Sequence, residues 1–311
     1  MNLLQEMGYA AYGVRDLDRA VDFFRDACQL EVSERDGGTV YLTGDTRHHW
    51  VRLERSEEPG MIRLGYRAAG AAAIQEIARR LDAAGIAWTP GADPGRVAGG
   101  LRFRAPDGVN YEIYEKMLTL PSSPAPARGI TCLLHAVVFV RDPAASRDFY
   151  TGVLGMRVSD RIEDVITFLR CGNLYHHSLA LARGDGALDH IAMLVDGVED
   201  VLAFRANAAL RGALAGDIVK HVASNSVSVY LTHAEEGIGV EFCNGHDRIA
   251  DDSYTGRLLK AGPGTVNAWS AGFPARPIPE PAGAPRADAS AGGGTAAGEA
   301  AMAGSAARAG R

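Results

Sequence analysis

The chain has 311 residues, of which 47% are hydrophobic and 23% charged, so it can bury a sizeable core across about two domains. A formal net charge of -6, with no Lys/Arg-rich block, argues against a nucleic-acid-binding protein. No stretch reaches the roughly 18 apolar residues of a membrane span, and the amino terminus lacks a signal-peptide pattern, so we expect a cytoplasmic protein without a membrane partner.

The first half of the chain alternates short strands with two amphipathic helices. Asp16 is a candidate N-cap for the first helix, whose apolar residues recur at helical spacing from Leu17 to Phe24. Gly85 would terminate the second helix. In chain order, the pattern predicts strands over 8–14, 38–43, 49–54 and 61–68, a helix over 71–84 and a strand over 111–114.

The second half repeats this order. Pro143 suits the first turn of a helix that follows Asp142, because its missing N–H has no intrahelical partner there. Strands are predicted over 134–140, around 158, 166 and 178, over 189–195, and, after a helix over 201–210, over 227–231 and 240–243.

The two halves are copies of one unit. A shift of 126 residues places Arg15, Asp16, Asp22, Phe23, Phe24 and Val32 on Arg141, Asp142, Asp148, Phe149, Tyr150 and Val158. We therefore predict an α+β fold of two tandem modules, each built from two βαβββ units that form a half-open, mostly antiparallel barrel. The expected boundaries are a first module over 1–117, a Pro/Ser/Ala linker over 118–130, a second module over 131–260 and an Ala/Gly/Pro-rich tail over 261–311, disordered from about Pro274 onward.

Three candidate metal ligands occur at matching places in the second copy. His135 and His190 each lie in the first strand of a unit, and Glu241 lies in the last strand of the second unit. Alternation along a strand would turn these side chains inward while neighbours such as Ala136 and Phe242 turn away. Two imidazoles and one carboxylate on one face suit Fe(II), and Mn(II) accepts the same ligands.

The first copy cannot hold an ion in this way. In the first copy Tyr9 corresponds to His135, and Arg63 lies near the position of His190. Glu112, which corresponds to Glu241, is the one retained donor. The first module is therefore expected to be metal-free.

These residues resemble the type I extradiol ring-cleavage dioxygenases of the vicinal oxygen chelate superfamily, which includes the glyoxalases and bleomycin-resistance proteins. The resemblance covers about residues 7–245 and implies that His135, His190 and Glu241 bind Fe(II). It also implies a metal-free first module, a catecholic substrate, O2 as co-substrate and assembly into homo-oligomers.

Three further positions match the resemblance. The run from His177 to Leu181 fits the strand that carries the acid–base histidine of the family, and His221 precedes Tyr230 by the family's nine residues. His177 is thus expected to take the catechol proton, and His221 and Tyr230 to hydrogen-bond the bound oxygens. Glu241 follows Tyr230 by eleven residues where the family has ten, a difference that a turn can absorb.

The remaining histidines are predicted to have no catalytic role. Strand alternation would turn His176 away from His177, as a solvent-facing or packing side chain. The pair His48-His49 is interpreted as a non-catalytic counterpart of His176-His177. Two others, His233 and His246, lie in turn or loop sequence and are expected at the surface.

Two other functions remain open from the sequence. A glyoxalase-like isomerase or lyase would use the metal without oxygen, although such proteins generally draw ligands from both modules. A metal-free, ligand-sequestering protein of the bleomycin-resistance type would have no need for His177, His221 and Tyr230 around the three ligand candidates.

Overall fold

A computed structural model describes residues 2–91, 93, 95–124, 129–185 and 188–271. The tail that the sequence predicts to be disordered from Pro274 onward lies outside the described residues. None of the helices in the described part of the chain is both long enough and apolar enough to cross a membrane.

The first module is an eight-stranded sheet made of two βαβββ units. Its first unit consists of β1 (Leu4–Val14), α1 (Leu17–Asp22) with a π-helical turn (Phe23–Ala27), β2 (Glu31–Asp36), β3 (Thr39–Thr43) and β4 (Val51–Arg55). Its second unit consists of β5 (Gly60–Ala68), α2 (Ala71–Ala83), β6 (Trp88–Gly91), β7 (Val97–Arg104) and β8 (Asn110–Met117).

The second module repeats the plan in a ten-stranded sheet. Its first unit consists of β9 (Ile130–Val140), α3 (Pro143–Gly152), β10 (Arg157–Ile162), β11 (Ile166–Arg170) and β12 (Leu179–Arg183). Its second unit consists of β13 (Leu188–Val195), α4 (Val198–Leu210), β14 (Leu214–Ala215), β15 (Val219–Lys220), β16 (Val227–His233) and β17 (Ile238–Asn244). A further strand, β18 (Arg257–Leu259), pairs with β10.

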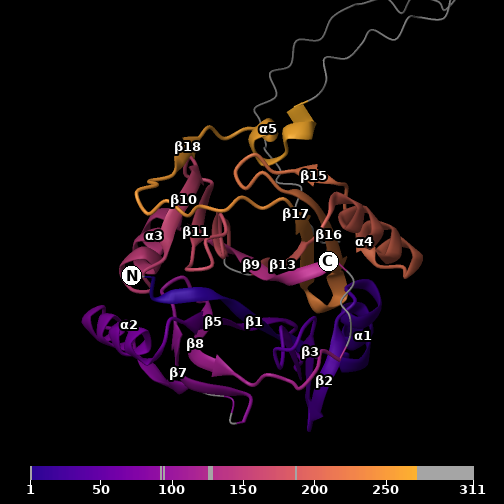
Figure 1. The fold of residues 1–311 in the computed structure, drawn as a ribbon, viewed down its shortest axis with the longest axis horizontal. Coiled ribbons are helices and arrows are strands. Elements are labelled where there is room, and N and C mark those ends of the chain that lie inside the picture. Colours follow the sequence, from indigo (N-terminus) through magenta and orange to yellow (C-terminus); the bar gives the residue numbers. More distant parts are fainter. Residues whose placement is uncertain (1, 92, 94, 125–128, 186–187, 272–311) are drawn as a thin grey trace, which may run out of the picture.

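The strand order explains why each module is a half-open barrel. The first sheet runs β2-β3-β4-β1-β5-β8-β7-β6, so the first and last strands of each unit pair in parallel and the two units join through antiparallel β1 and β5. The second sheet has the same order through antiparallel β9 and β13. The predicted α+β fold of paired βαβββ units is confirmed, with helices at the periphery of the molecule (Figure 1).

Local sequence signals account for the helix boundaries. Asp16 accepts a hydrogen bond from the backbone N–H of Arg19, and Asp142 caps α3 in the same way through two backbone N–H groups. Gly85 follows α2 with a φ of 68°, a left-handed conformation that glycine adopts without a Cβ clash. The predicted N-cap at Asp16 is therefore present, and Asp142 has the same role in the second module.

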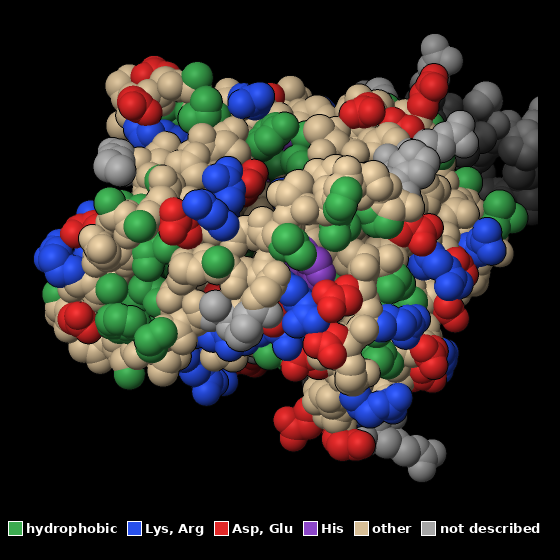
Figure 2. Space-filling view, turned by 60° about the horizontal axis from the view of Figure 1, so that its bottom comes forward, with side chains coloured by type: hydrophobic (Ala, Val, Ile, Leu, Met, Phe, Trp, Pro, Cys, Tyr) green, Lys and Arg blue, Asp and Glu red, His purple; other side chains and the backbone are tan. Residues whose placement is uncertain are grey.

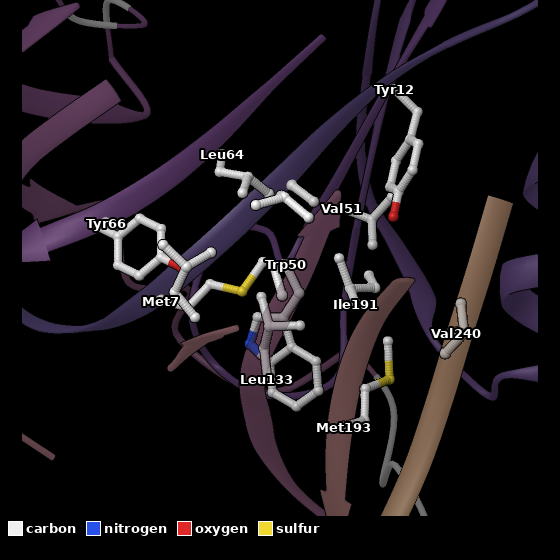
Figure 3. Packing of buried hydrophobic residues seen from close by; sticks show 14 of the residues in the cluster. Met7, Tyr12, Trp50, Val51, Leu64, Tyr66, Leu133, Ile191, Met193 and Val240 are labelled. Carbon is white, nitrogen blue, oxygen red and sulfur yellow. The ribbon is translucent and has the colours of Figure 1, made fainter. Parts of the chain in front are cut away.

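The two sheets face one another across a shared apolar core. Met7, Tyr66 and Trp50 of the first module approach Leu133 and Met193 of the second (Figure 3). The Tyr66 hydroxyl also donates a hydrogen bond across the interface to the backbone carbonyl of Ser178. Burial of these large side chains favours the packing of the two modules because it removes apolar surface from water. On the face shown in Figure 2, acidic and basic side chains are interspersed.

The segments that flank the second module contain ordered contacts. In the predicted linker, the backbone carbonyl of Leu118 accepts a hydrogen bond from His48 N–H. In the predicted tail, residues up to Ala271 are folded and include α5 (Pro263–Val266) and a 3₁₀ turn (Ala268–Ala271). The carbonyl of Val266 lies 2.9 Å from Nδ1 of His221, so this part of the chain contacts a predicted site residue.

Candidate metal centre

His135, His190 and Glu241 converge at one point in the second sheet. They lie in the adjacent strands β9, β13 and β17, and Ala192 of the middle strand pairs in register with both His135 and Glu241. Directly paired residues share a face, as do residues two apart in one strand, so His190 joins them. The small side chain of Ala192 leaves the space between the three ligand candidates free.

The distances within this group suit a metal ion. Glu241 Oε2 lies 3.0 Å from Nε2 of His135 and 3.0 Å from Nε2 of His190. Ligands about 2.1 Å from an ion and at right angles to one another are separated by about 3.0 Å. All three side chains are buried, so the contacts between them are shielded from water.

Asp189 orients one of the imidazoles, and the sequence interpretation missed it. Its Oδ2 lies 2.6 Å from Nδ1 of His190, which holds a proton on Nδ1, so that Nε2 is the nitrogen that binds an ion once it releases its own proton. The pairing of β9 with β13 is irregular between Leu188 and His190, which lets Asp189 depart from strict alternation and reach the same site. The sequence signal that could have identified Asp189 is its position directly before a candidate histidine ligand.

Burial and hydrogen bonding set the protonation of the group. Burial alone would lower the pKa of His190, but the carboxylates of Asp189 and Glu241 outweigh it and raise this pKa to about 9. Burial would raise the pKa of Glu241, yet hydrogen bonds from His135, His190 and His221 hold it well below its usual range. Glu241 is therefore ionised at neutral pH and carries the negative charge that a divalent cation requires.

His177 lies beside this group, held by a chain of buried polar residues. Its ring centroid is 4.1 Å from that of His135. Its Nδ1 lies 3.0 Å from Nδ1 of His176, whose Nε2 lies 3.0 Å from Asp160. Burial and the neighbouring imidazoles hold the pKa of His177 well below its usual value, so this ring is neutral at pH 7 and can accept a proton.

The prediction that His176 points away from His177 was wrong. Both histidines precede β12, which begins at Leu179, so strand alternation does not apply to them. His176 is 1% exposed and supports His177 instead of facing solvent. The same arrangement recurs in the first module, where His48 links His49 to Glu34.

His221 and Tyr230 form a second pair at the site. The Tyr230 hydroxyl lies 2.8 Å from Nε2 of His221, and this nitrogen lies 3.6 Å from Oε1 of Glu241. Burial and the charge of Glu241 raise the pKa of Tyr230 well above its usual value, so the phenol keeps its proton as a donor. Tyr230 pairs directly with Glu241 across β16 and β17, and the turn between these strands ends at Gly237, whose φ is 64°.

One histidine that the sequence placed at the surface is inside the protein. His246 is 6% exposed, and its ring centroid is 4.6 Å from that of His177. It was misplaced because it follows β17 in loop sequence, where no periodicity indicates direction. His233 is partly buried, with its ring against Phe23 of the first module.

The matching place in the first module is filled by an ion-paired cluster. The Tyr9 hydroxyl donates a hydrogen bond to Glu112, and Arg63 donates one to Tyr9. Arg102, which occupies the register position of Tyr230, also pairs with Glu112. Two guanidinium groups occupy the space around the carboxylate, and this cluster offers no imidazole in place of His135 or His190.

Comparison with known proteins agrees with this architecture. Residues 6–113 and 133–242 each match the Glyoxalase/Bleomycin resistance protein/Dioxygenase superfamily. Biphenyl-2,3-diol 1,2-dioxygenase of Metapseudomonas furukawaii is 30% identical over 264 residues, which cover 77% of this chain and 86% of that protein. An iron-dependent extradiol dioxygenase of Rhodococcus jostii is 27% identical over 78% of this chain and 88% of its own.

A solved structure extends the likeness to the fold. The Mn(II)-bound glyoxalase of Novosphingobium aromaticivorans superposes with a TM-score of 0.81 at 24% identity, covering 88% of this chain and 93% of that one. The family match spans both sequence repeats, as the duplicated βαβββ plan requires. This chain belongs to the Glyoxalase/Bleomycin resistance protein/Dioxygenase superfamily.

Proposed function

We propose that this protein is an extradiol dioxygenase that uses O2 to open a catechol-type aromatic ring beside its two hydroxyl groups. The observation that carries the proposal is the convergence of His135, His190 and Glu241 on one face of the second sheet. Three protein ligands leave coordination positions open for a substrate and O2. The names of the two extradiol dioxygenases reported above support the same reaction class.

The ion would be Fe(II), and the same donors also accept Mn(II). Two imidazole nitrogens and one carboxylate oxygen about 3.0 Å apart fit either ion, and Asp189 fixes the tautomer of His190. When bound, the ion supplies Lewis acidity and a template for both catechol oxygens and O2.

His177 would accept the proton that a catechol loses on binding. Its ring is neutral at pH 7 and adjoins that of His135, which places it beside the ion's position. His176 and Asp160 occupy the Nδ1 side of His177, which leaves Nε2 as the nitrogen that would take the substrate's proton. The same nitrogen could return the proton later in the cycle.

His221 and Tyr230 would hydrogen-bond the bound catechol oxygen. Their mutual contact of 2.8 Å uses one hydrogen and holds the Tyr230 hydroxyl and Nε2 of His221 on one side of Glu241, where either group could donate to a substrate oxygen in place of that contact. Preorganised donors in a buried site stabilise developing negative charge more strongly than water does. We therefore assign proton transfer to His177 and charge stabilisation to the pair of His221 and Tyr230.

The test measures O2 consumption and the yellow ring-fission product with Fe(II)-loaded protein. Biphenyl-2,3-diol and unsubstituted catechol are the first substrates, because a relative is named for the former. His135→Ala is expected to abolish turnover, whereas His233→Ala, a histidine outside the site, keeps it. Full turnover by His135→Ala, or no O2 uptake with any catechol, would overturn the proposal.

The same assay separates the glyoxalase-like alternative. An isomerase or lyase would bind the metal but consume no O2 with catechols. The cluster of Tyr9, Arg63 and Glu112 supports the oxygenase, because in the first module Tyr9 and Arg63 stand where the second module has His135 and His190. Assembly into homo-oligomers stays a prediction, which light scattering can measure.

A further inference from the structure

His246 is a buried imidazole whose ring nitrogens have no hydrogen-bond partner within the part of the chain that the structure describes. It follows β17 and is 6% exposed, and neither Nδ1 nor Nε2 finds a partner among the described residues. A buried polar group left unpaired costs about 1–3 kcal/mol. Such a group indicates a ligand that completes its bonding, since nearly all buried polar atoms in folded proteins are paired.

The neighbours of His246 indicate what this ligand is. Its ring centroid lies 4.6 Å from that of His177 and 5.6 Å from that of His135. One ring nitrogen of each of the three lies within 4.8 Å of the others. Nδ1 of His135 is also buried without a partner among the described residues, and His177 directs its Nδ1 to His176. Ring nitrogens of the three imidazoles therefore lie close together, and Nδ1 of His135 and both nitrogens of His246 have no hydrogen-bond partner among the described residues.

We propose that His135, His177 and His246 form a second metal site, which takes an imidazole-preferring ion such as Zn²⁺. Zn²⁺ binds histidine nitrogen at about 2.0–2.1 Å in tetrahedral sites, which places the nitrogens about 3.3 Å apart. His246 lies in the loop after β17, where a small shift can close the difference. Three neutral imidazoles favour Zn²⁺, whereas the group that contains Glu241 suits Fe(II) or Mn(II).

The two sites exclude one another because both use His135. A neutral imidazole offers one lone pair, since its other nitrogen carries the proton. An ion held by His135, His177 and His246 therefore removes a ligand from the first site and occupies the proposed proton acceptor. Given the proposed function, Zn²⁺ at this place is an inhibitor that keeps Fe(II) out, although the site itself does not depend on that function.

The test uses Co²⁺, whose visible absorption reports tetrahedral binding, in a background that lacks the first site. Glu241→Ala leaves all three imidazoles and is expected to bind one Co²⁺ per chain in equilibrium dialysis, with Zn²⁺ displacing it. Adding His246→Phe is expected to abolish both the absorption and the binding. Adding His233→Phe is the matched control and is expected to leave both unchanged.

A second variant that lacks the first site controls for misfolding of Glu241→Ala. His190→Gln also disrupts the first site while it preserves the three histidines, and circular dichroism verifies that each variant is folded. Failure of both backgrounds to bind Co²⁺, or equal binding with and without His246→Phe, overturns the second site. O2 uptake plays no part in these measurements, so their failure is distinguishable from failure of the proposed oxygenase activity.

Discussion

Replacement of Asp189 by alanine should weaken metal binding by about 10- to 100-fold, because the carboxylate orients a candidate ligand. Asp189 Oδ2 lies 2.6 Å from Nδ1 of His190, a short contact typical of a charge-assisted hydrogen bond. The Asp189 side chain is 16% exposed, so water replaces it poorly. The expected loss corresponds to about 1.4–2.8 kcal/mol of binding free energy.

The assay is anaerobic competition for Fe(II) or Mn(II) against a chelator of known affinity. Asp189→Asn keeps an acceptor oxygen opposite Nδ1 but removes the charge, so its affinity is expected between those of the wild type and Asp189→Ala. Asp185→Ala is the matched control, since this carboxylate is 92% exposed and pairs at the surface with Arg141. Affinity of Asp189→Ala within twofold of the control would refute the orienting role.

Three other variants test separate parts of the account. His177→Gln in Fe(II)-loaded protein should lower kcat by about 10²–10⁴-fold while KM for the catechol changes less, and steady-state kinetics with near-normal kcat would contradict a role in proton transfer. Glu112→Gln leaves the mostly buried Arg63 without its carboxylate and should lower the free energy of unfolding by about 3–5 kcal/mol. Urea titrations measure this loss, and unchanged stability would show that the ion pair is dispensable. Burial and the nearby His48 hold the pKa of His49 well below its usual value, so the unfolded state binds more protons than the folded state below about pH 6.5. The free energy of unfolding should therefore fall by up to about 1.4 kcal/mol for each unit that the pH drops there. His49→Phe should flatten this dependence, and an unaltered slope would exclude His49 as its source.

The metal group was predictable because it obeys two simple periodicities. His135 and His190 occupy matching places, the first strands of the two βαβββ units of the second module, and strand alternation puts them on the face of Glu241. Alternation fails at a bulge, so Asp189 was missed although it directly precedes His190. It also fails outside strands, which explains the misjudged directions of His176 and His246.

Strands at sheet edges were harder to predict than central ones. The residues of β2, at one edge of the first sheet, are partly or fully exposed and mostly polar. Pro90 interrupts β6 at the other edge, and β7 contains two consecutive glycines. Pairing with a neighbouring strand stabilises these segments, and that contribution is invisible in the local sequence. The central strands β1 and β9 bury most of their residues and were predicted from their own pattern.

The most direct test of the account is anomalous diffraction from crystals grown with Mn(II). We expect one peak per chain, about 2.0–2.3 Å from Nε2 of His135, Nε2 of His190 and the nearer carboxylate oxygen of Glu241. A fully loaded crystal with no peak between these three side chains, or with its peak in the first module, would contradict the placement of the metal centre.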